Sequence, residues 1–450
     1  MKKIFQYIML AVVTIVMASC TSDIEEPTAT TGKNNVQLVV GEFPAFGDSQ
    51  TRAIGTPDEG KTSWAEGDEL LLVIDNTSYG SHSATFTYNG KSWKLTSGEL
   101  VYREGDPAYI PHVYYAPNYK WEAGKLVLKE GKDPGTDEYI EGNARITGNS
   151  ETITVSFAEA TRKYSRLRIA TLPNEQITVD TEDFTPAGSS DMEQKGNYTL
   201  TSDEKGNAYL YGTFENNSEV TVKYREAALT TYTFSQATES AKSYALDATV
   251  ISANSAEEIK SAIKQKVADG KTAIRLNLAP NAGTDEFMAI REAIKGAAPN
   301  DEGTIELTII GVETIPEEAF KRMSQLKSVK MPDVKEIKKY AFSECQYLTV
   351  VEAPSLNKLN CGAFNECYLL SKLTFGPINY ADARYWPIFE DITPNIDLIL
   401  SDYQKEMIET DDDLYTANND IDYAFSPEHV SKNFLGHEFK SITCSRYRVE

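Results

Sequence analysis

The sequence has few histidines, the residue on which many metal sites and catalytic centres depend. It contains four histidines, His82, His112, His429 and His437, and none stands at metal-ligand spacing from a cysteine, another histidine or a carboxylate. It has no Gly-x-Ser-x-Gly, P-loop or dinucleotide-binding motif. We therefore expect a protein that is not an enzyme and that has no cofactor and no metal.

Two weaker chemical possibilities remain. The sequence is compatible with a cysteine–histidine nucleophile pair, although the cysteines fall mainly within a repeat described below. The acidic stretch Asp411–Asp413, with Asp420 and Asp422, offers the oxygen ligands that calcium prefers. Its spacing matches no known calcium-binding loop, so a solvated acidic turn is the preferred interpretation.

Cysteine and positive charge are also scarce. Apart from Cys20, the chain has Cys345, Cys361, Cys367 and Cys444, too few for a disulfide framework, and their pairing does not follow from sequence. The 44 lysines and arginines are outnumbered by 67 aspartates and glutamates, which gives a formal net charge of −23. Such a surface repels phosphate, so we expect no nucleic-acid partner and no purely electrostatic attachment to a membrane.

Long apolar runs are absent except at the start of the chain. Lys2 and Lys3 precede the apolar stretch Ile4–Met17, which is shorter than the ~20 residues of a membrane span and has the length of a signal-peptide core. The run ends Ala18-Ser19-Cys20, which resembles the bacterial lipobox with Met17 in place of the usual leucine. The alternative is a secreted protein with a cysteine there by chance.

The resemblance to lipoproteins implies a signal peptide at residues 1–19, acylation of Cys20, and a lipid anchor and flexible tether at residues 20–35. An acidic run, Asp23-Ile24-Glu25-Glu26, resembles the surface-export signal of lipoproteins of anaerobic gut and oral Gram-negative bacteria. The tether is polar and lacks apolar periodicity. We therefore expect a protein anchored by lipid to the outer membrane and exposed at the cell surface.

The stretch 36–250 is predicted to be β-rich, because short apolar runs alternate with Gly, Asn, Asp and Pro and helical periodicity is nearly absent. Clear examples of such runs are residues 36–40, 69–74, 84–88, 153–157 and 209–214. Asn89-Gly90 predicts a tight hairpin, since both turn positions favour φ > 0. Strand spacing and length together predict two antiparallel β-sandwiches, at 36–147 and 148–250.

Several motifs in this stretch resemble the fimbrillin-like family of pilins and related surface lipoproteins. They are Thr51-Arg52-Ala53, Trp64-Ala65-Glu66-Gly67-Asp68, Ala84-Thr85-Phe86, Trp93, Tyr114-Tyr115-Ala116-Pro117, Val155-Ser156-Phe157, Arg166-Leu167-Arg168-Ile169 and Ser243-Tyr244-Ala245-Leu246. The resemblance covers residues 36–250 and implies tandem fimbrillin-like, transthyretin-like sandwiches.

The same resemblance implies a role for Arg52. In pilins of this family a protease cuts after an arginine that follows the first strand, and the next subunit fills the opened groove by strand addition. Here Val36–Glu42 would be the removable strand, Arg52 the cleavage site, and other fimbrial subunits the partners. The alternative is that Thr51-Arg52 is an ordinary loop.

The stretch Trp64–Asp68 is interpreted as structural. Gly67 permits a turn with φ > 0, Asp68 can close that turn by a hydrogen bond, and Trp64 can anchor it by burial. We do not expect a binding site there.

Residues 305–377 carry an internal repeat with a step of 22 residues. Its clearest column consists of Ala319-Phe320, Ala341-Phe342 and Ala363-Phe364. One unit of this length cannot bury its own apolar face, whereas stacked units share a core, so the pattern predicts a solenoid. It resembles the BspA-type leucine-rich repeats of bacterial surface adhesins.

The solenoid is assigned to residues 304–400, with an α/β N-terminal cap at 251–303 and a C-terminal cap at 401–450. The first cap is predicted to contain a helix at 255–268, a strand at 272–278 and a helix at 284–295. A last strand is expected at Ile396–Leu400 and a short helix at Tyr403–Glu409.

Cys345 and Cys367 stand one repeat apart, where stacked strands are ~4.8 Å apart, so a disulfide between them is geometrically possible. A column of buried free cysteines is the preferred interpretation. On the strand face, the outward columns are Ser328, Val350 and Lys372, and Lys330, Glu352 and Thr374. From these we select Lys330, Glu352 and Lys372 as a candidate ligand face.

These patterns predict a mainly β protein: two sandwiches followed by a short leucine-rich-repeat solenoid. We expect a surface adhesin that binds a host or bacterial surface protein or glycan through its repeats. One alternative is a fimbrial tip or accessory subunit assembled by donor-strand exchange. A minor alternative is a carbohydrate-capture lipoprotein, because the 25 tyrosines supply rings that stack on sugars, although a β-rich composition explains them as well.

Overall fold

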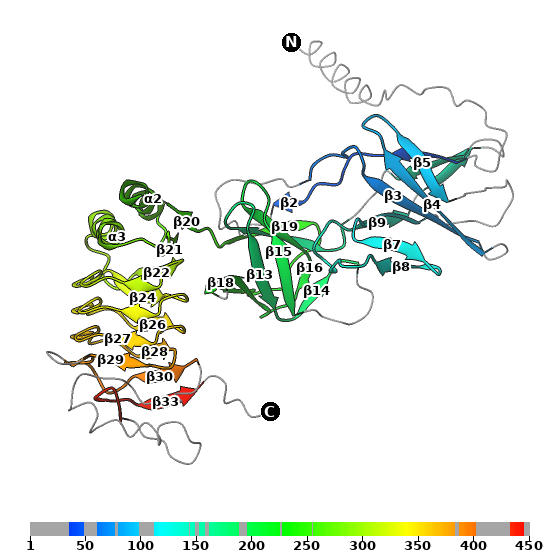
Figure 1. Ribbon diagram of the computed structural model, residues 1–450. Coiled ribbons are helices and arrows are strands. Elements are labelled where there is room, and N and C mark those ends of the chain that lie inside the picture. Colours follow the sequence, from blue (N-terminus) through cyan, green and yellow to red (C-terminus); the bar gives the residue numbers. More distant parts are fainter. Residues whose placement is uncertain are drawn as a thin grey trace, which may run out of the picture.

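The computed structural model describes twelve stretches of the chain, namely residues 36–48, 61–76, 80–98, 112–143, 145–148, 153–157, 162–188, 196–225, 227–253, 255–382, 387–401 and 433–444. Within them the protein is mainly β, with two α-helices. Two β units come first, and a stack of parallel strands forms the C-terminal part (Figure 1).

The first β unit has two layers. One is a five-stranded antiparallel sheet in the order β5 (Trp93–Gly98), β4 (Gly80–Tyr88), β3 (Glu69–Asn76), β6 (His112–Tyr115) and β9 (Ile140–Asn143). The other is a three-stranded sheet in the order β1 (Val36–Val40), β11 (Ile153–Phe157) and β10 (Arg145–Gly148). They share an apolar core in which Leu38 of β1 packs with Leu70 and Leu72 of β3. Alternation of inward and outward side chains along β3 produces this buried face.

Strand β11 belongs to the first β unit, whereas the sequence pattern assigned its residues to the second sandwich. Residues 153–157 were assigned to the second sandwich, yet Ile153 is the partner of Val36 and Val155 is the partner of Ile146. The first unit therefore continues through Phe157, past the expected boundary after residue 147. Apolar alternation predicts that a strand forms, but it does not specify which distant strand lies beside it.

The predicted hairpin at Asn89-Gly90 is a four-residue connection. Tyr88 pairs with Trp93, so the loop comprises residues 89–92. Gly90 has φ +85°, whereas Asn89 is not among the residues with positive φ. The Asn89 side chain instead accepts hydrogen bonds from the amides of Lys91 and Ser92, at 3.0 and 2.8 Å. This side-chain bonding replaces the expected turn with φ > 0 at both positions.

The second β unit also has two layers. Its first sheet has the order β14 (Phe184–Pro186), β16 (Asn207–Phe214), β12 (Ser165–Ala170), β19 (Lys242–Asp247) and β2 (Gly47–Asp48). Its second sheet has the order β15 (Asn197–Thr201), β13 (Gln176–Thr181), β17 (Glu219–Tyr224) and β18 (Ala227–Thr233). Side chains from both sheets fill one core, in which the Phe184 and Phe214 rings stack with centroids 4.4 Å apart.

A small hairpin, β7 (Tyr119–Glu122) and β8 (Lys125–Leu128), lies between the two β units (Figure 1). It belongs to neither large sheet. The Tyr119 hydroxyl donates a hydrogen bond of 3.1 Å to the carbonyl oxygen of Ala187, which ties the hairpin to the second unit.

The C-terminal part contains an eight-stranded sheet in which every pairing is parallel. Its order is β20 (Ile251–Ser252), β21 (Ala273–Asn277), β22 (Ile305–Ile310), β24 (Leu326–Lys330), β26 (Val350–Ala353), β28 (Lys372–Phe375), β30 (Asp397–Leu400) and β33 (Ser441–Cys444). A second parallel ladder consists of β23 (Thr314–Ile315), β25 (Glu336–Ile337), β27 (Lys358–Leu359) and β29 (Tyr380–Ala381). The 22-residue step aligns Ser328 with Val350 and Val350 with Lys372.

Helices α2 (Ala256–Ala268) and α3 (Thr284–Ala297) lie at the N-terminal end of this stack (Figure 1). Ser255 caps α2, as its spacing to Glu258 predicts, because the serine hydroxyl accepts a hydrogen bond from the Glu258 amide at 3.3 Å. At the other end a hairpin of β31 (Asn433–Phe434) and β32 (His437–Glu438) precedes β33. The helix expected at 403–409 lies outside the described residues, as do the acidic positions 411–413, 420 and 422 and His429.

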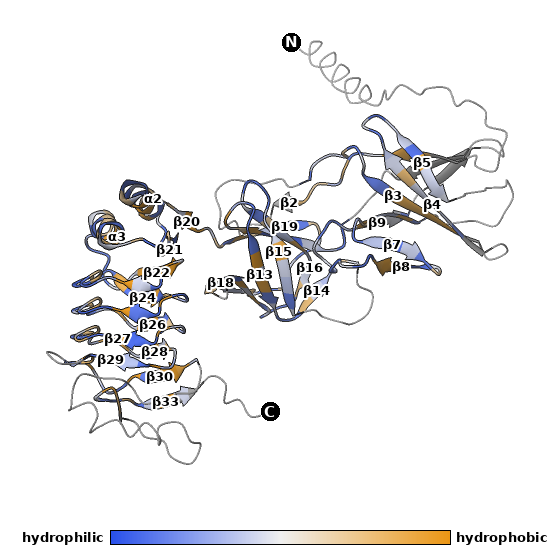
Figure 2. Cartoon of the chain, viewed as in Figure 1, coloured by the Kyte–Doolittle hydropathy of each residue, from blue (hydrophilic) through white to orange (hydrophobic). Residues whose placement is uncertain are grey.

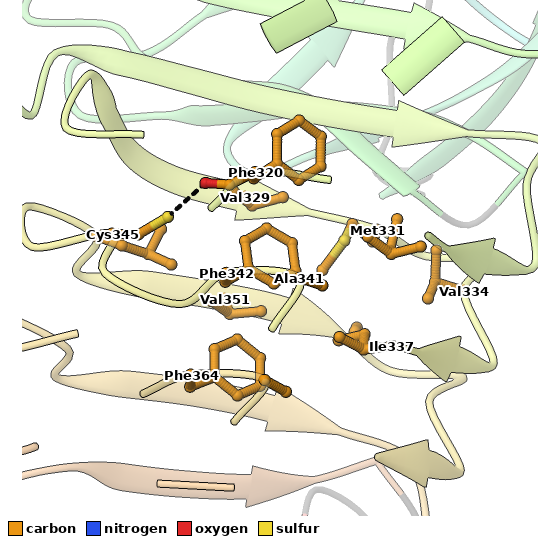
Figure 3. Close-up of a cluster of buried hydrophobic side chains, with 14 of the residues drawn as sticks. Phe320, Val329, Met331, Val334, Ile337, Ala341, Phe342, Cys345, Val351 and Phe364 are labelled. Atoms are coloured by element: carbon orange, nitrogen blue, oxygen red, sulfur yellow. Dashed lines mark hydrogen bonds between the residues drawn. The ribbon is translucent and has the colours of Figure 1, made fainter. Parts of the chain in front are cut away.

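The interior of the repeats is a column of aromatic rings. Phe320, Phe342 and Phe364 are fully buried and stack with centroids 5.3 and 5.5 Å apart (Figure 3). Each ring comes from the same position of successive repeats, so the ring of one repeat packs on the ring of the next. Fully burying one such side chain contributes roughly 1.5–3 kcal/mol.

The repeats pack against the second β unit. Ile310, at the end of β22, is buried in the core of that unit. Arg275 on β21 donates from Nε to the carbonyl oxygen of Leu229 at 2.5 Å. These contacts join the first strands of the parallel sheet to β18.

Candidate interaction surface on the repeats

The three residues of the candidate ligand face lie on neighbouring strands of the parallel sheet. Lys330, Glu352 and Lys372 are on β24, β26 and β28, and their neighbours Val329, Val351 and Leu373 are buried in the repeat core. This alternation points the three charged side chains away from the core. Figure 2 shows hydrophilic and hydrophobic residues mixed along these strands.

The structure brings two of the three residues directly together. Lys330 pairs with Glu352 in the sheet register, and the distance from Nζ to Oε2 is 3.6 Å. Lys372 belongs to the adjacent column, where it aligns with Val350 and Asp397. The candidate face is therefore a pair with a flanking lysine, and not one column of charges.

Similar ion pairs continue along the sheet. Lys327 reaches Glu306 at 2.8 Å, and Lys440 reaches Asp397 at 3.0 Å. Asp397 also accepts a hydrogen bond from Ser441, and these two donors lower the pKa of its carboxyl group. Exposed pairs of this kind contribute at most about 1 kcal/mol each to stability, so they remain available to exchange partners with a ligand.

The chemistry offered by this face is non-covalent. It presents ammonium donors and carboxylate acceptors in rows separated by the ~4.8 Å strand spacing. Among the described residues no group of three or more His, Cys, Asp or Glu side chains is arranged to hold a metal ion.

The cysteines of the repeats lie in the interior of the repeat region. The Cys345 thiol donates to the Phe320 carbonyl oxygen at 3.0 Å (Figure 3), and the Cys367 thiol donates to the Phe342 carbonyl oxygen at 3.2 Å. Burial raises the pKa of Cys345 to about 12 and that of Cys367 well above its usual value. Both are free thiols, so the structure matches the interpretation as packed cysteines and contains no disulfide between them.

Two other predicted sites, Cys20 and Arg52, lie outside the described residues. The segment that precedes Arg52, residues 36–48, is described and contacts both β units. In the first unit, the Trp64 indole donates to the carbonyl oxygen of Gly41 at 2.9 Å, and the Phe43 ring meets the Trp64 ring edge-on at 4.8 Å. The turn at Asp68 forms as expected, with the Ala65 amide donating to its carboxylate at 2.7 Å.

In the second unit, the Phe46 ring lies between two arginines. The Arg162 and Arg166 guanidinium carbons are 3.7 and 4.7 Å from its centroid. Arg162 also donates to the carbonyl oxygen of Pro44 at 3.0 Å and forms a buried ion pair with Glu138. The segment ends at β2, which pairs with β19 at the edge of its sheet.

Sequence reasoning missed a cavity of about 460 Å³ on the first β unit. Tyr114, Tyr119, Trp121, Asp137 and Asp68 are among the residues that line it. The sequence singled out Tyr114 as part of a family motif and Asp68 as part of a turn. The signal that pointed toward such a site was the high tyrosine content.

Comparisons with known proteins identify the repeats. Residues 304–385 match the family model of the BspA type leucine rich repeat region, in six copies. This match confirms the predicted repeat class over that part of the chain. No curated protein shows significant similarity to the sequence.

Several solved structures were found by structural similarity, including the following two. One is a candidate cell adhesion protein of Bacteroides fragilis, 11% identical, covering 48% of this chain and 92% of that chain with a TM-score of 0.28. The other is the minor pilin GBS52 of Streptococcus agalactiae, 11% identical, covering 48% of this chain and 94% of that chain with a TM-score of 0.19. Neither score is high enough to show a shared fold.

Among the described helices, none is long and apolar enough to span a membrane.

Proposed function

We propose that the protein is a lipid-anchored adhesin of the bacterial outer surface that binds a protein partner through the outer face of its parallel repeat sheet. The observation that carries this proposal is the set of outward charges on β24, β26 and β28, aligned on a repeat whose class is established over residues 304–385. Alternating lysine and glutamate side chains can pair with both kinds of charge on an extended polypeptide.

The remainder of the architecture fits presentation of that face away from a membrane. In this proposal residues 36–250 are tandem fimbrillin-like sandwiches, Cys20 carries the lipid, and no catalytic step is involved. The acidic chain, with its net charge of −23, would stay soluble outside the cell.

The test is adhesion of the purified chain to immobilised fibronectin and fibrinogen. Replacing Lys330, Glu352 and Lys372 together by alanine should reduce binding about ten- to a hundredfold, because rim charges contribute up to about 1 kcal/mol each. A matched control replaces Glu313, Lys335 and Lys358 by alanine. These have the same charges, and Glu313 and Lys335 form a similar exposed ion pair of 2.6 Å beside the second ladder.

Adhesion that is unchanged in the first variant, or equally reduced in both, would contradict the proposed face.

Membrane attachment is tested separately with Cys20→Ser, which removes the thiol that lipid would modify. This variant should leave the membrane fraction and appear in the soluble fraction.

A second candidate function is a fimbrial subunit assembled by donor-strand exchange. The observation that favours it is that β1 and β2 are both edge strands, and both lie in the segment that a cut after Arg52 would release. Loss of that segment would leave β11 and β19 with unpaired backbone groups, which another strand could fill. The mass of the N-terminal peptide of protein from cell envelopes separates the two: a lipid-modified Cys20 supports the anchored adhesin, and a start at Ala53 supports the fimbria.

A further inference from the structure

The cavity on the first β unit lies on the side of the sheet away from its core. Leu71 of β3 pairs with Thr85 of β4 on one side and with Tyr114 of β6 on the other, and all three line the cavity. Their chain neighbours Leu70, Leu72, Ala84, Phe86, Val113 and Tyr115 are buried in the core between the sheets. The cavity floor is therefore a set of outward-facing side chains on three paired strands.

The hairpin β7–β8 forms a wall of this cavity. Trp121 and Leu126 are partners across the hairpin, and both line the cavity. The Trp121 and Tyr114 rings are neighbours, with an interplanar angle of 29° and centroids 6.4 Å apart. The hydrogen bond from the Tyr119 hydroxyl to Ala187 ties the start of this hairpin to the second β unit.

The polar groups of the cavity include carboxylates, hydroxyls and the ammonium groups of Lys120 and Lys129. Asp137 uses Oδ1 to accept the Glu138 amide at 2.8 Å, which leaves its other oxygen available as an acceptor. Ser83 and Thr85 add hydroxyl groups from β4. Asp68 is already engaged by Lys61 and by the Tyr115 hydroxyl, each at 3.0 Å, so it shapes the wall.

This combination matches the two surfaces of a sugar ring. The C–H face of a sugar packs on the electron-rich face of an aromatic ring, and its hydroxyls donate to carboxylates. The lining contains three carboxylates, Asp68, Glu69 and Asp137, against two lysines. With the strongly acidic chain, this balance disfavours anionic ligands.

We propose that the cavity binds a neutral oligosaccharide, with Trp121 and Tyr114 packing on a sugar ring and Asp137 accepting hydrogen bonds from its hydroxyls. The cavity volume of about 460 Å³ falls within the ~300–1,000 Å³ that small-molecule sites occupy. This site lies on a different part of the chain from the repeat face, so it adds a second binding activity to the proposed adhesin.

The test uses the full-length mature chain and a panel of maltotetraose, cellotetraose, xylotetraose, mannotetraose and N-acetylchitotriose. Titration calorimetry and tryptophan fluorescence should show binding of at least one sugar at concentrations up to about 10 mM. Trp121→Ala and Asp137→Asn should each weaken that binding at least about tenfold, and Trp121→Phe, which keeps a ring, should lose less. Tyr232→Ala is the control, because Tyr232 is an exposed aromatic residue on the second β unit.

Thermal unfolding of each variant establishes that it is folded, and Asp137→Asn keeps the shape of the side chain. The proposal is overturned if no sugar binds the wild-type chain, or if Trp121→Ala and Asp137→Asn bind as well as wild type. Binding of a tryptic casein digest without binding of any sugar would make this a peptide site and would also overturn it. Replacing Lys330, Glu352 and Lys372 should leave sugar binding unchanged, which separates this result from a failure of the repeat face.

Discussion

In the parallel repeat sheet, neighbouring strands are also neighbours in the sequence. In the β units, by contrast, the edge strands β1 and β2 pair with strands that are distant in the sequence. Ser328 pairs with Val350, one repeat later. Val36 pairs with Ile153, and Gly47 pairs with Lys242. The repeats are therefore held together by contacts between residues close in the sequence, and the β units depend on contacts between residues distant in the sequence.

The difference has a structural consequence. Damage to one repeat acts on its two neighbours, since Phe342 contacts the rings before and after it. Residues 36–48 form one strap that crosses from one β unit to the other, because β1 belongs to the first unit and β2 to the second. Loosening the strap therefore weakens the junction of the units and also removes Leu38 and Phe43 from the core of the first unit.

The largest effect is expected from Phe342→Ala. Removing this ring from the centre of the stack should lower the free energy of unfolding of the repeats by about 3–5 kcal/mol. Urea titration followed by circular dichroism would show the repeats unfolding first. In a Trp386→Phe background, which removes the tryptophan that falls within the repeat sequence, fluorescence should change at higher urea, because Trp64 and Trp93 belong to the first β unit and Trp121 to the hairpin beside it. Coincident transitions would contradict the separation of the two regions.

The repeat region was more predictable than the β units. Its 22-residue period indicates where each strand lies and also which strand it pairs with. Once Ala319-Phe320 and Ala341-Phe342 are seen to be one step apart, the alignment of Val329 with Val351 follows. The capping serine of α2 was also predictable, because capping is a local interaction between Ser255 and Glu258.

Features that depend on contacts between residues distant in the sequence were harder to predict from the sequence. The sequence indicates a strand at 153–157 but contains no local signal that Ile153 would lie beside Val36. The cavity is similarly non-local, because Tyr114, Trp121 and Asp137 come from a sheet strand, a hairpin and a loop. Only the tyrosine content and a separate family motif pointed toward them.

A smaller effect is expected from Phe46→Ala, which tests the strap directly. Loss of the ring between Arg162 and Arg166 should lower stability by about 1–2 kcal/mol, the magnitude of desolvated cation–π contacts. Limited trypsin digestion should then release the N-terminal segment faster than from the wild-type chain. The control is Tyr232→Ala, whose ring is exposed. Equal release from both variants would show that Phe46 does not hold the strap.

The thiols of the repeat interior should be unreactive in the folded protein. Cys345 and Cys367 are fully buried and their pKa values are raised by burial, so little thiolate forms at neutral pH. Cys345→Ala should cost about 1 kcal/mol through loss of the hydrogen bond to Phe320. Labelling with a thiol reagent, with and without urea, measures the first point. Rapid labelling of both thiols in the native chain would show that the repeats open locally.

The smallest effect concerns the C-terminal end of the repeats, where local stacking stops. His437 packs against Phe389 and Phe439, with centroids 5.6 and 4.9 Å away, and burial lowers its pKa below 6.5. Since the folded pKa is depressed, the neutral form stabilises the fold above the unfolded pKa, and this stability is lost as pH falls below about 6.5. Amide exchange in β33 should therefore accelerate between pH 7 and pH 5 after correction for the intrinsic rate, while exchange in β24 and β26 should not. His437→Gln should remove the pH dependence, and its persistence in that variant would assign it to another group.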